Sequence, residues 1–335
     1  MTAARERLLL AAPFPWFGGK SRAAPLIWDR LGAVDNYVEP FAGSLAVLLG
    51  APRIARTETI NDLDGFVANF WRAVGKDPEA VAEFADWPVN EADLSARHLW
   101  LVARREEFTL RLQADPDYYD AKIAGWWCWG LCCWIGSGWC SGEGPWHSVD
   151  GQLVHLGDAG RGVNRQLVHL GNAGQGVNRQ LVHLGTAGRG VNRQLGLYEW
   201  FDALGARLAR VRVCCGDWQR ICGPTPTTKQ GLTAVVLDPP YSTDERDDRL
   251  YAKDSGTVAA DCRRWALDHG DDPSMRIVLC GYDTEHDMPG WTTEAWKAHG
   301  GYGSQATAGE NVNATRETLW FSPHCLGATQ GRLFG

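Results

Sequence analysis

An acid, two prolines and a tyrosine directly follow the very apolar segment 233–237. Each proline lacks an N–H and fixes its φ angle, so Pro239 and Pro240 should end this expected strand in a rigid loop. Ligands of open α/β sheets bind at this carboxyl end of a strand. The carboxylate of Asp238 and the carbonyl of Pro239 could accept both hydrogens of an exocyclic amine, while the ring of Tyr241 stacks on the base. A plain proline-rich turn is the alternative for this tetrapeptide taken alone.

A glycine turn and a second acid fit a nucleoside site. The turn EPFAGS, residues 39–44, ends an expected strand at 36–41, and Asp62 lies nineteen residues after Gly43 at the end of the next expected strand. This spacing is typical of α/β sites in which the acid binds the ribose hydroxyls. The patterns GxGxxG and GxxxxGK[ST] do not occur, which disfavours dinucleotide and nucleoside triphosphate sites.

The elements around these residues alternate between strand and helix patterns. The expected strands span residues 36–41, 57–60, 211–217, 233–237 and 276–280. Apolar residues recur at helical spacing over 65–87 and again over 200–210. A closing antiparallel pair is expected from 292–299 and 318–322. The order predicts an α/β fold with a parallel, doubly wound sheet.

The middle of the chain has a different pattern. We expect residues 88–142 to be helical, with a charged helix at 91–112 and a buried apolar helix at 121–134. Residues 152–193 then contain three near-identical copies of the unit QLVHLGxAGxGVNR. Each copy combines a strand-like piece with a glycine-rich turn, which predicts either a small stack of strands or a surface loop.

The charge of the chain limits how it could bind nucleic acid. A net charge of −7 argues against a surface that grips phosphates over its whole area. The three repeats are nevertheless basic, with five arginines and one acid, so a local basic surface is compatible with the acidic total. No uncharged apolar run of membrane-spanning length occurs, and we expect a cytoplasmic protein without a membrane partner.

Ten cysteines raise the question of a metal or disulfide framework. Four of them lie in the tryptophan-rich middle: Cys128, Cys132, Cys133 and Cys140. Reduced, buried thiols are the expected state, and a metal site is the alternative. The histidines of the repeats are expected on a strand face rather than as ligands, so no metal is predicted.

The segment FPWFGGK, residues 14–20, adds an aromatic residue, two glycines and a cation before the first strand. The chain resembles the D12 (Dam-like) class of N6-adenine-specific DNA methyltransferases from phages and bacteria. The resemblance is carried by five segments in that family's order, namely PWFGGK, EPFAGS, NDLD, GDW and LDPPY. The resemblance extends to GYD at 281–283 and to WFSP at 320–323. It implies a Rossmann-like methyltransferase sheet built from residues 1–87 and 196–335, and a helical, repeat-containing target-recognition insertion at 88–195.

The resemblance also implies a cofactor and roles for individual residues. The catalytic tetrapeptide would be Asp238, Pro239, Pro240 and Tyr241. S-adenosyl-L-methionine would be bound by Trp16, Phe17, Gly18, Gly19, Lys20, Glu39, Pro40, Phe41, Gly43, Asp62 and Asp217. In this set the glycine turn lies beside the methionine moiety, Asp62 at the ribose and Asp217 near the adenine. The family often has glycine where Leu45 stands, which affects the details of cofactor contact.

Each of these residues also has a structural alternative. Trp16 could anchor a surface segment in the core, and Lys20 could be solvated at an exposed helix start. Asp62 could cap a helix that begins near Asp64, and Asp217 could be a turn residue. The common order of the motifs favours the functional interpretation over four independent turns.

We therefore expect a site-specific enzyme that methylates N6 of an adenine flipped out of double-stranded DNA. The alternatives are N4-cytosine methylation, an RNA or protein methyltransferase with the same tetrapeptide, and an inactive DNA-binding module. Four repeat arginines are hypothesised to contact DNA: Arg161, Arg165, Arg189 and Arg193. A monomer is expected, with a cognate restriction enzyme as a candidate partner.

Overall fold

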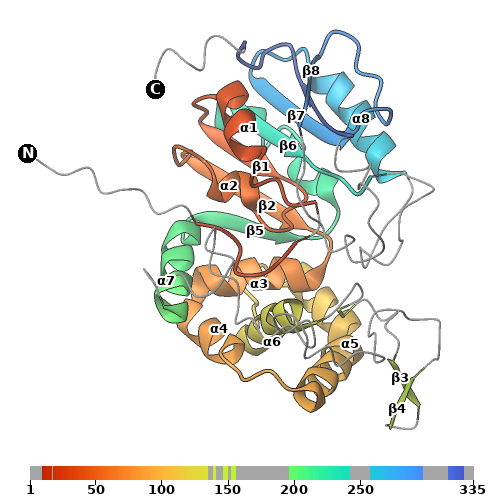
Figure 1. Cartoon of the computed structure of the whole chain (residues 1–335). Coiled ribbons are helices and arrows are strands. Elements are labelled where there is room, and N and C mark those ends of the chain that lie inside the picture. Colours follow the sequence, from red (N-terminus) through yellow and green to blue (C-terminus); the bar gives the residue numbers. More distant parts are fainter. Residues whose placement is uncertain are drawn as a thin grey trace, which may run out of the picture.

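The computed structural model contains a seven-stranded sheet with helices on both faces (Figure 1). It describes residues 10–16, 18–134, 139–140, 146–149, 152–155, 196–241, 257–296 and 316–327. The strands lie in the order β5-β2-β1-β6-β7-β9-β8. The first five are parallel, and β9 runs antiparallel between β7 and β8. The predicted α/β fold is confirmed.

The strands begin and end close to their predicted positions. Their bounds are β1 (Asn36–Glu39), β2 (Thr57–Asp62), β5 (Val211–Cys215), β6 (Thr233–Leu237), β7 (Met275–Tyr282), β8 (Thr292–Ala295) and β9 (Glu317–Phe321). The order in which strands are added to the sheet reverses between the parallel strands β1 and β6. Strands β2 and β5 lie on the β1 side, and β7 lies on the β6 side. The carboxyl ends of β1 and β6 therefore form the crevice in which ligands of such sheets bind.

Alternate side chains of the central strand β6 serve two separate cores. Ala234 and Val236 pack on the face that carries α1 and α2, while Val235 and Leu237 pack on the opposite face with Cys262 of α8. All five residues of β6 are buried, as expected for a parallel strand covered on both faces.

The helices are α1 (Ala24–Leu31), α2 (Ala46–Leu49), α3 (Gly65–Lys76), α4 (Pro78–Ala85), α5 (Glu91–Ala114), α6 (Ala121–Cys133), α7 (Leu197–Leu208) and α8 (Val258–His269). Two 3₁₀ helices, η3 (Trp218–Ile221) and η4 (Thr228–Gln230), follow β5. The helical pattern expected over 65–87 is confirmed, but it is divided between two helices, α3 and α4. Asp77 ends α3 and accepts from the N–H of Ala80, and Pro78 begins α4 because its missing N–H cannot continue α3.

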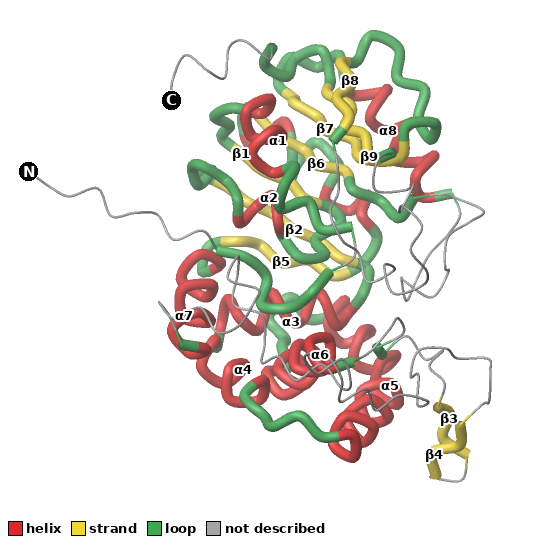
Figure 2. Tube along the Cα trace, in the orientation of Figure 1, coloured by secondary structure: helices red, strands yellow, loops and turns green. Residues whose placement is uncertain are grey.

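Helices α3 to α7 gather beside the β5 edge of the sheet (Figure 2). Helix α6 packs against α3 and α4, and α7 packs against the same two helices. The buried helix expected at 121–134 is confirmed, and Trp127 and Trp129 of α6 are each at most 3% exposed. The boundaries proposed for the insertion, 88 and 195, stay a prediction.

A small hairpin follows this helical part. Strand β3 (Trp146–Val149) pairs antiparallel with β4 (Gln152–His155), which is the strand-like piece of the first repeat. The rest of the repeats lies outside the described residues, and so do the four arginines proposed to contact DNA and Phe17 of the proposed cofactor site.

The cysteine-rich segment is part of the hydrophobic core. Cys128, Cys132, Cys133 and Cys140 are free thiols and at most 1% exposed. Cys132 Sγ lies 3.3 Å from the carbonyl oxygen of Pro13. Within the described residues, no three His, Cys, Asp or Glu side chains form a group that could hold a metal ion. No helix in the same part of the chain is long and apolar enough to cross a membrane.

Candidate active site

The loops that follow β1, β2 and β5 are joined at the carboxyl edge of the sheet. The side-chain amide of Asn61 donates to the carbonyl of Pro40 at 3.1 Å and to that of Gly216 at 2.9 Å. The N–H of Ala42 donates to the carbonyl of Asn61, and the N–H of Gly216 to that of Asp62. These bonds bring the expected glycine turn and both expected cofactor acids to one edge.

The glycine turn requires glycine at position 43. Gly43 has a φ of +44°, and a Cβ there would lie 2.5 Å from the indole nitrogen of Trp16. The indole N–H of Trp71 donates to the Gly43 carbonyl at 2.8 Å, and the Gly43 N–H donates to Asp62 Oδ2 at 3.0 Å. The structure thus brings together Trp16, Gly43 and Asp62, three of the predicted cofactor residues.

Asp62 ends β2 with its carboxylate directed at backbone N–H groups. Its second oxygen accepts from the N–H of Asp64 at 2.9 Å. Burial raises the pKa of Asp62 to about 7, although the N–H of Gly43 opposes the rise. The expected alternative, Asp62 as a helix cap, is wrong, because Asp64 caps α3 by accepting from the N–H of Phe66. The N–H groups of Gly43, Leu63 and Asp64 occupy three of the four lone pairs of this carboxylate, so one remains for a hydroxyl.

Asp217 and Phe41 lie on neighbouring loops. The exposed Asp217 accepts from the N–H of Gln219 at 2.8 Å and so caps η3, as a turn residue would. The next residue, Trp218, places its ring 6.0 Å from that of Phe41. Two aromatic rings therefore stand beside the acid that was expected near the adenine of the cofactor.

The loop after β6 meets the segment before α1 through an ion pair. Lys20 Nζ lies 2.9 Å from Asp238 Oδ1 and also donates to the carbonyl of Gly18 at 2.9 Å. The expected alternative of a solvated Lys20 is wrong, since this residue is 4% exposed. Gly18, with a φ of +71°, turns the chain there, and a Cβ on Gly19 would lie 3.4 Å from the Trp16 carbonyl.

The protonation states of Lys20 and Tyr241 depend on the carboxylates beside them. Burial alone lowers the pKa of Lys20, but the carboxylates of Asp238 and Glu317 raise it above its ordinary value, so the ammonium is retained. Burial, Asp238 and Glu317 raise the pKa of Tyr241 well above its usual range, so its hydroxyl keeps its hydrogen.

The tyrosine of the tetrapeptide is fixed at both its ring and its hydroxyl. The hydroxyl donates to Glu317 Oε2 at 2.8 Å and lies 3.3 Å from Asp238 Oδ1. The ring of Tyr282 meets the Tyr241 ring edge-on, with centroids 4.7 Å apart. Pro239 is buried and Pro240 half-buried, which holds the corner between β6 and the tyrosine.

Glu39 forms a second buried carboxyl group close to the pair. It is 4% exposed, at the end of β1, and accepts the hydroxyl hydrogen of Tyr37 at 2.8 Å. Burial and the nearby Asp238 raise the pKa of Glu39 to about 8, against the opposing effect of the Tyr37 hydroxyl. The Glu39 carboxyl is therefore mostly protonated at neutral pH.

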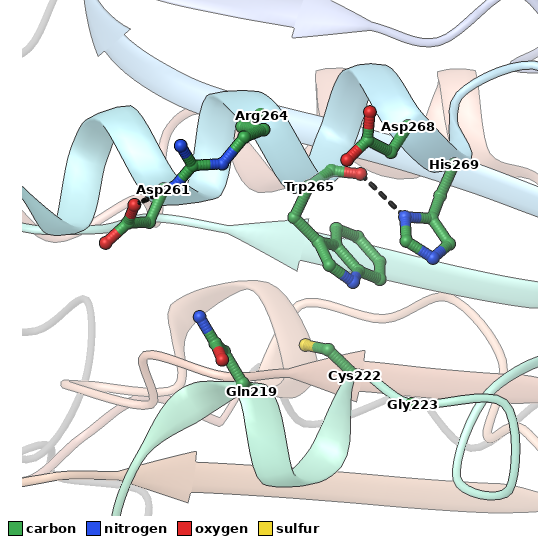
Figure 3. Close-up of a pocket in the computed structure, with 8 residues that line it drawn as sticks. All are labelled: Gln219, Cys222, Gly223, Asp261, Arg264, Trp265, Asp268 and His269. Atoms are coloured by element: carbon green, nitrogen blue, oxygen red, sulfur yellow. Dashed lines mark hydrogen bonds and ion pairs between the residues drawn. The ribbon is translucent and has the colours of Figure 1, made fainter.

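A pocket of about 320 Å³ lies elsewhere, between η3 and α8 (Figure 3). It is lined by Gln219, Cys222, Gly223, Asp261, Arg264, Trp265, Asp268 and His269. None of the predicted site residues lines it. Arg264 is already paired with Asp261, and His269 Nδ1 lies 2.8 Å from the Trp265 carbonyl, so these three side chains are engaged locally. We place the candidate site at the sheet edge instead.

Sequence reasoning missed Glu317 at this site. The expected closing strand began at residue 318, one position later. A buried acid at the start of an otherwise apolar strand was the available signal, because such an acid needs a specific partner. The partners, Lys20 and Tyr241, become visible only once β9 is paired with β7.

Comparison with known proteins supports the resemblance in the part of the chain that builds one half of this edge. The model of the family described as D12 class N6 adenine-specific DNA methyltransferase matches residues 16–114. The match includes Lys20, the glycine turn and Asp62, and it ends before the loop after β6. No curated protein matches the chain.

Proposed function

Because residues 16–114 match the model of the D12 class of N6 adenine-specific DNA methyltransferases, we propose that the chain methylates N6 of an adenine flipped out of double-stranded DNA. The observation that carries this proposal is the position of Asp238. Its carboxylate lies at the switch point of the sheet, ion-paired to Lys20 of the matched segment. A hydrogen-bond acceptor for an amine and the matched cofactor segment therefore share one crevice.

The residues at the edge fit S-adenosyl-L-methionine, which supplies an electrophilic methyl group on a sulfonium. The fit rests on the absence of a side chain at Gly43, where a Cβ would meet Trp16, and on the remaining lone pair of the Asp62 carboxylate. Asp62 would accept from the ribose hydroxyls, and the rings of Phe41 and Trp218 would border the adenine. Lys20 and the glycine turn would lie next to the methionine end of the cofactor.

Asp238 would make the target nitrogen nucleophilic by orienting it. The lone pair of an adenine amine is delocalised into the ring, which makes it a poor nucleophile. Hydrogen bonds from the amine to Asp238 and to the Pro239 carbonyl favour a tetrahedral nitrogen whose lone pair points at the methyl group. The contribution is one of positioning and electrostatics. The new nitrogen–carbon bond would replace the carbon–sulfur bond of the methyl donor, which would leave as a neutral thioether, and the proton given up by the amine would pass to the Asp238 carboxylate and then to water.

Tyr241 would hold the flipped base. A base taken out of the duplex loses its stacking partners, and an aromatic side chain replaces part of that stacking. The hydroxyl bond to Glu317 and the edge contact from Tyr282 hold the ring in one orientation. We place recognition of the DNA sequence in the insertion, residues 88–195.

Transfer of a labelled methyl group tests this function. The purified chain is incubated with methyl-labelled S-adenosyl-L-methionine and unmethylated DNA, and the DNA is digested to nucleosides for mass analysis. We expect N6-methyladenine. Label in N4-methylcytosine would assign the alternative base, and label found only in transfer RNA or in protein added in parallel would overturn the assignment to DNA.

A further inference from the structure

Glu317 is a buried charged residue at the site for which the sequence patterns give no role. It is the first residue of β9 and lies opposite Tyr282 in the antiparallel register with β7. Its side chain is only 8% exposed. Buried carboxylates require specific partners, and those of Glu317 are the two groups that flank Asp238, namely Lys20 and Tyr241.

Four polar atoms form a closed ring that includes one oxygen of the proposed catalytic carboxylate. Lys20 Nζ lies 2.9 Å from Asp238 Oδ1 and 3.8 Å from Glu317 Oε2. The Tyr241 hydroxyl lies 2.8 Å from that same Oε2 and 3.3 Å from the same Oδ1. A hydroxyl donates a single hydrogen, so the shorter distance assigns it to Glu317. Asp238 Oδ1 is then left with the ammonium as its close donor.

This arrangement poses a problem for substrate binding. One of the two oxygens of Asp238, Oδ1, is held by Lys20, and Lys20 is 4% exposed. A buried ammonium that loses its counter-charge is strongly unfavourable. A carboxylate that turns toward the target amine draws Oδ1 away from Lys20, and the ammonium then needs another anion.

We propose that Glu317 is a positioning residue that holds the Tyr241 hydroxyl and receives the ammonium of Lys20 when Asp238 turns to the target amine. The inference rests on the proposed function, because it describes how the same site admits its substrate. The displacement required is small, since Lys20 is also bound by the Gly18 carbonyl and Glu317 Oε2 is already 3.8 Å away.

The negative charge of Glu317 is essential to this role. Coulomb attraction falls with distance, so a carboxylate at 3.8 Å retains about three quarters of the attraction of one at 2.9 Å in the same medium. The charged groups facing Glu317 are Lys20, Asp238 and Glu285, together with the Tyr241 hydroxyl. Burial raises the pKa of Glu317 and Lys20 opposes the rise, which links the ionisation of Glu317 to the position of the ammonium.

A double-mutant cycle tests the proposal. Glu317→Gln keeps an amide oxygen for the Tyr241 hydroxyl and removes the charge. We expect its single-turnover methyl transfer to fall about 10- to 100-fold, with cofactor affinity unchanged within about twofold. In a Lys20→Met background the same substitution should have no further effect, because no ammonium remains to be received. Glu83→Gln, at an exposed position on α4, is the matched control and should match the wild type.

The outcomes separate this inference from the proposed function. No methyl transfer to DNA by the wild-type chain overturns both. If the wild type transfers methyl groups and Glu317→Gln does so at the same rate, the inference alone is overturned. It is also overturned if Glu317→Gln causes an equal loss in the wild-type and Lys20→Met backgrounds, because an equal loss marks a structural role. If the Glu317→Gln variant does not bind cofactor, the rate of methyl transfer by Glu317→Asp tests the proposal instead. This variant keeps the charge and should retain most of the rate, and a loss of 10-fold or more with cofactor bound contradicts the proposal.

Discussion

Charged side chains removed from water define the site at the scale of single residues. Counted over the whole residue, Lys20 and Glu39 are each 4% exposed and Glu317 is 6% exposed. Burial disfavours the charged form, so the partners of each group decide its state. Lys20 keeps its charge between two carboxylates, whereas Glu39 is bound by the neutral hydroxyl of Tyr37 and titrates at about 8.

Glu39 should make the stability of the chain dependent on pH. Its pKa is about 8 in the folded chain and 4.5 ordinarily, so the folded state holds a proton that the unfolded state releases. The free energy of unfolding should therefore fall as pH rises from about 4.5 to 8. Glu39→Gln keeps the acceptor for Tyr37 and removes the titration, and it should be more stable than the wild type at pH 8, by up to about 4 kcal/mol.

Chemical denaturation at pH 5 and pH 8 measures this difference. Glu83→Gln, an exposed position on α4, is the control and should follow the wild type at both values. A wild-type chain whose stability relative to Glu39→Gln is the same at both pH values would show that Glu39 does not titrate in this range.

At the scale of elements, the entry into α2 shows two effects in competition. Leu45 has a φ of +53°, a left-handed conformation that favours glycine, and the related family often has glycine there. The Leu45 side chain is nevertheless fully buried in the core beside the glycine turn. The strained backbone costs about 1–2 kcal/mol, while a buried leucine contributes more than that through packing.

We therefore expect Leu45→Gly to destabilise the chain although it relieves the backbone. Truncation of a buried leucine costs about 2–5 kcal/mol, so the net loss should be about 1–3 kcal/mol. Thermal or denaturant unfolding gives the value. A variant that is as stable as the wild type or more stable would mean that backbone strain outweighs packing at this position.

The sheet could be predicted from the sequence because its signals are local. The apolar run 233–237 and the acids after 57–60 mark strand ends without reference to the rest of the chain. The break between α3 and α4 could also have been predicted from Pro78, since proline cannot continue a helix. The apolar periodicity over 65–87 does not show this break. The Lys20–Asp238–Glu317 contacts were not readable, because they depend on strand order and on the β7–β9 register, which no short pattern encodes.

At the scale of the molecule, opposite charges lie in different parts of the sequence. The chain as a whole carries −7, and the repeats at 152–193 carry five arginines and one acid. Phosphate binding depends on such local excess rather than on the total. In Figures 1 and 2 the helices α3 to α7 lie beside the β5 edge of the sheet that carries the candidate site, and α5 contacts β5.

Deletion of residues 166–193 tests the role of the repeats. It removes two copies and the arginines at 179, 189 and 193 while leaving the first copy. We expect weaker DNA binding and a salt dependence, as log affinity against log salt, that is shallower by about 2–3. Cofactor affinity should be unchanged. If DNA affinity and its salt dependence match those of the full chain, the repeats take no part in binding DNA.

The most direct test of the central claim compares two quantities in Asp238→Ala. These are the single-turnover rate of methyl transfer to DNA and the dissociation constant of S-adenosyl-L-methionine, with Asp261→Ala in the pocket beside α8 as the control. We predict that Asp238→Ala lowers the rate by about 10²- to 10³-fold and leaves the constant within about twofold, because the carboxylate acts on the amine. An unchanged rate, or an equal loss of transfer and cofactor binding, would contradict the role given to Asp238.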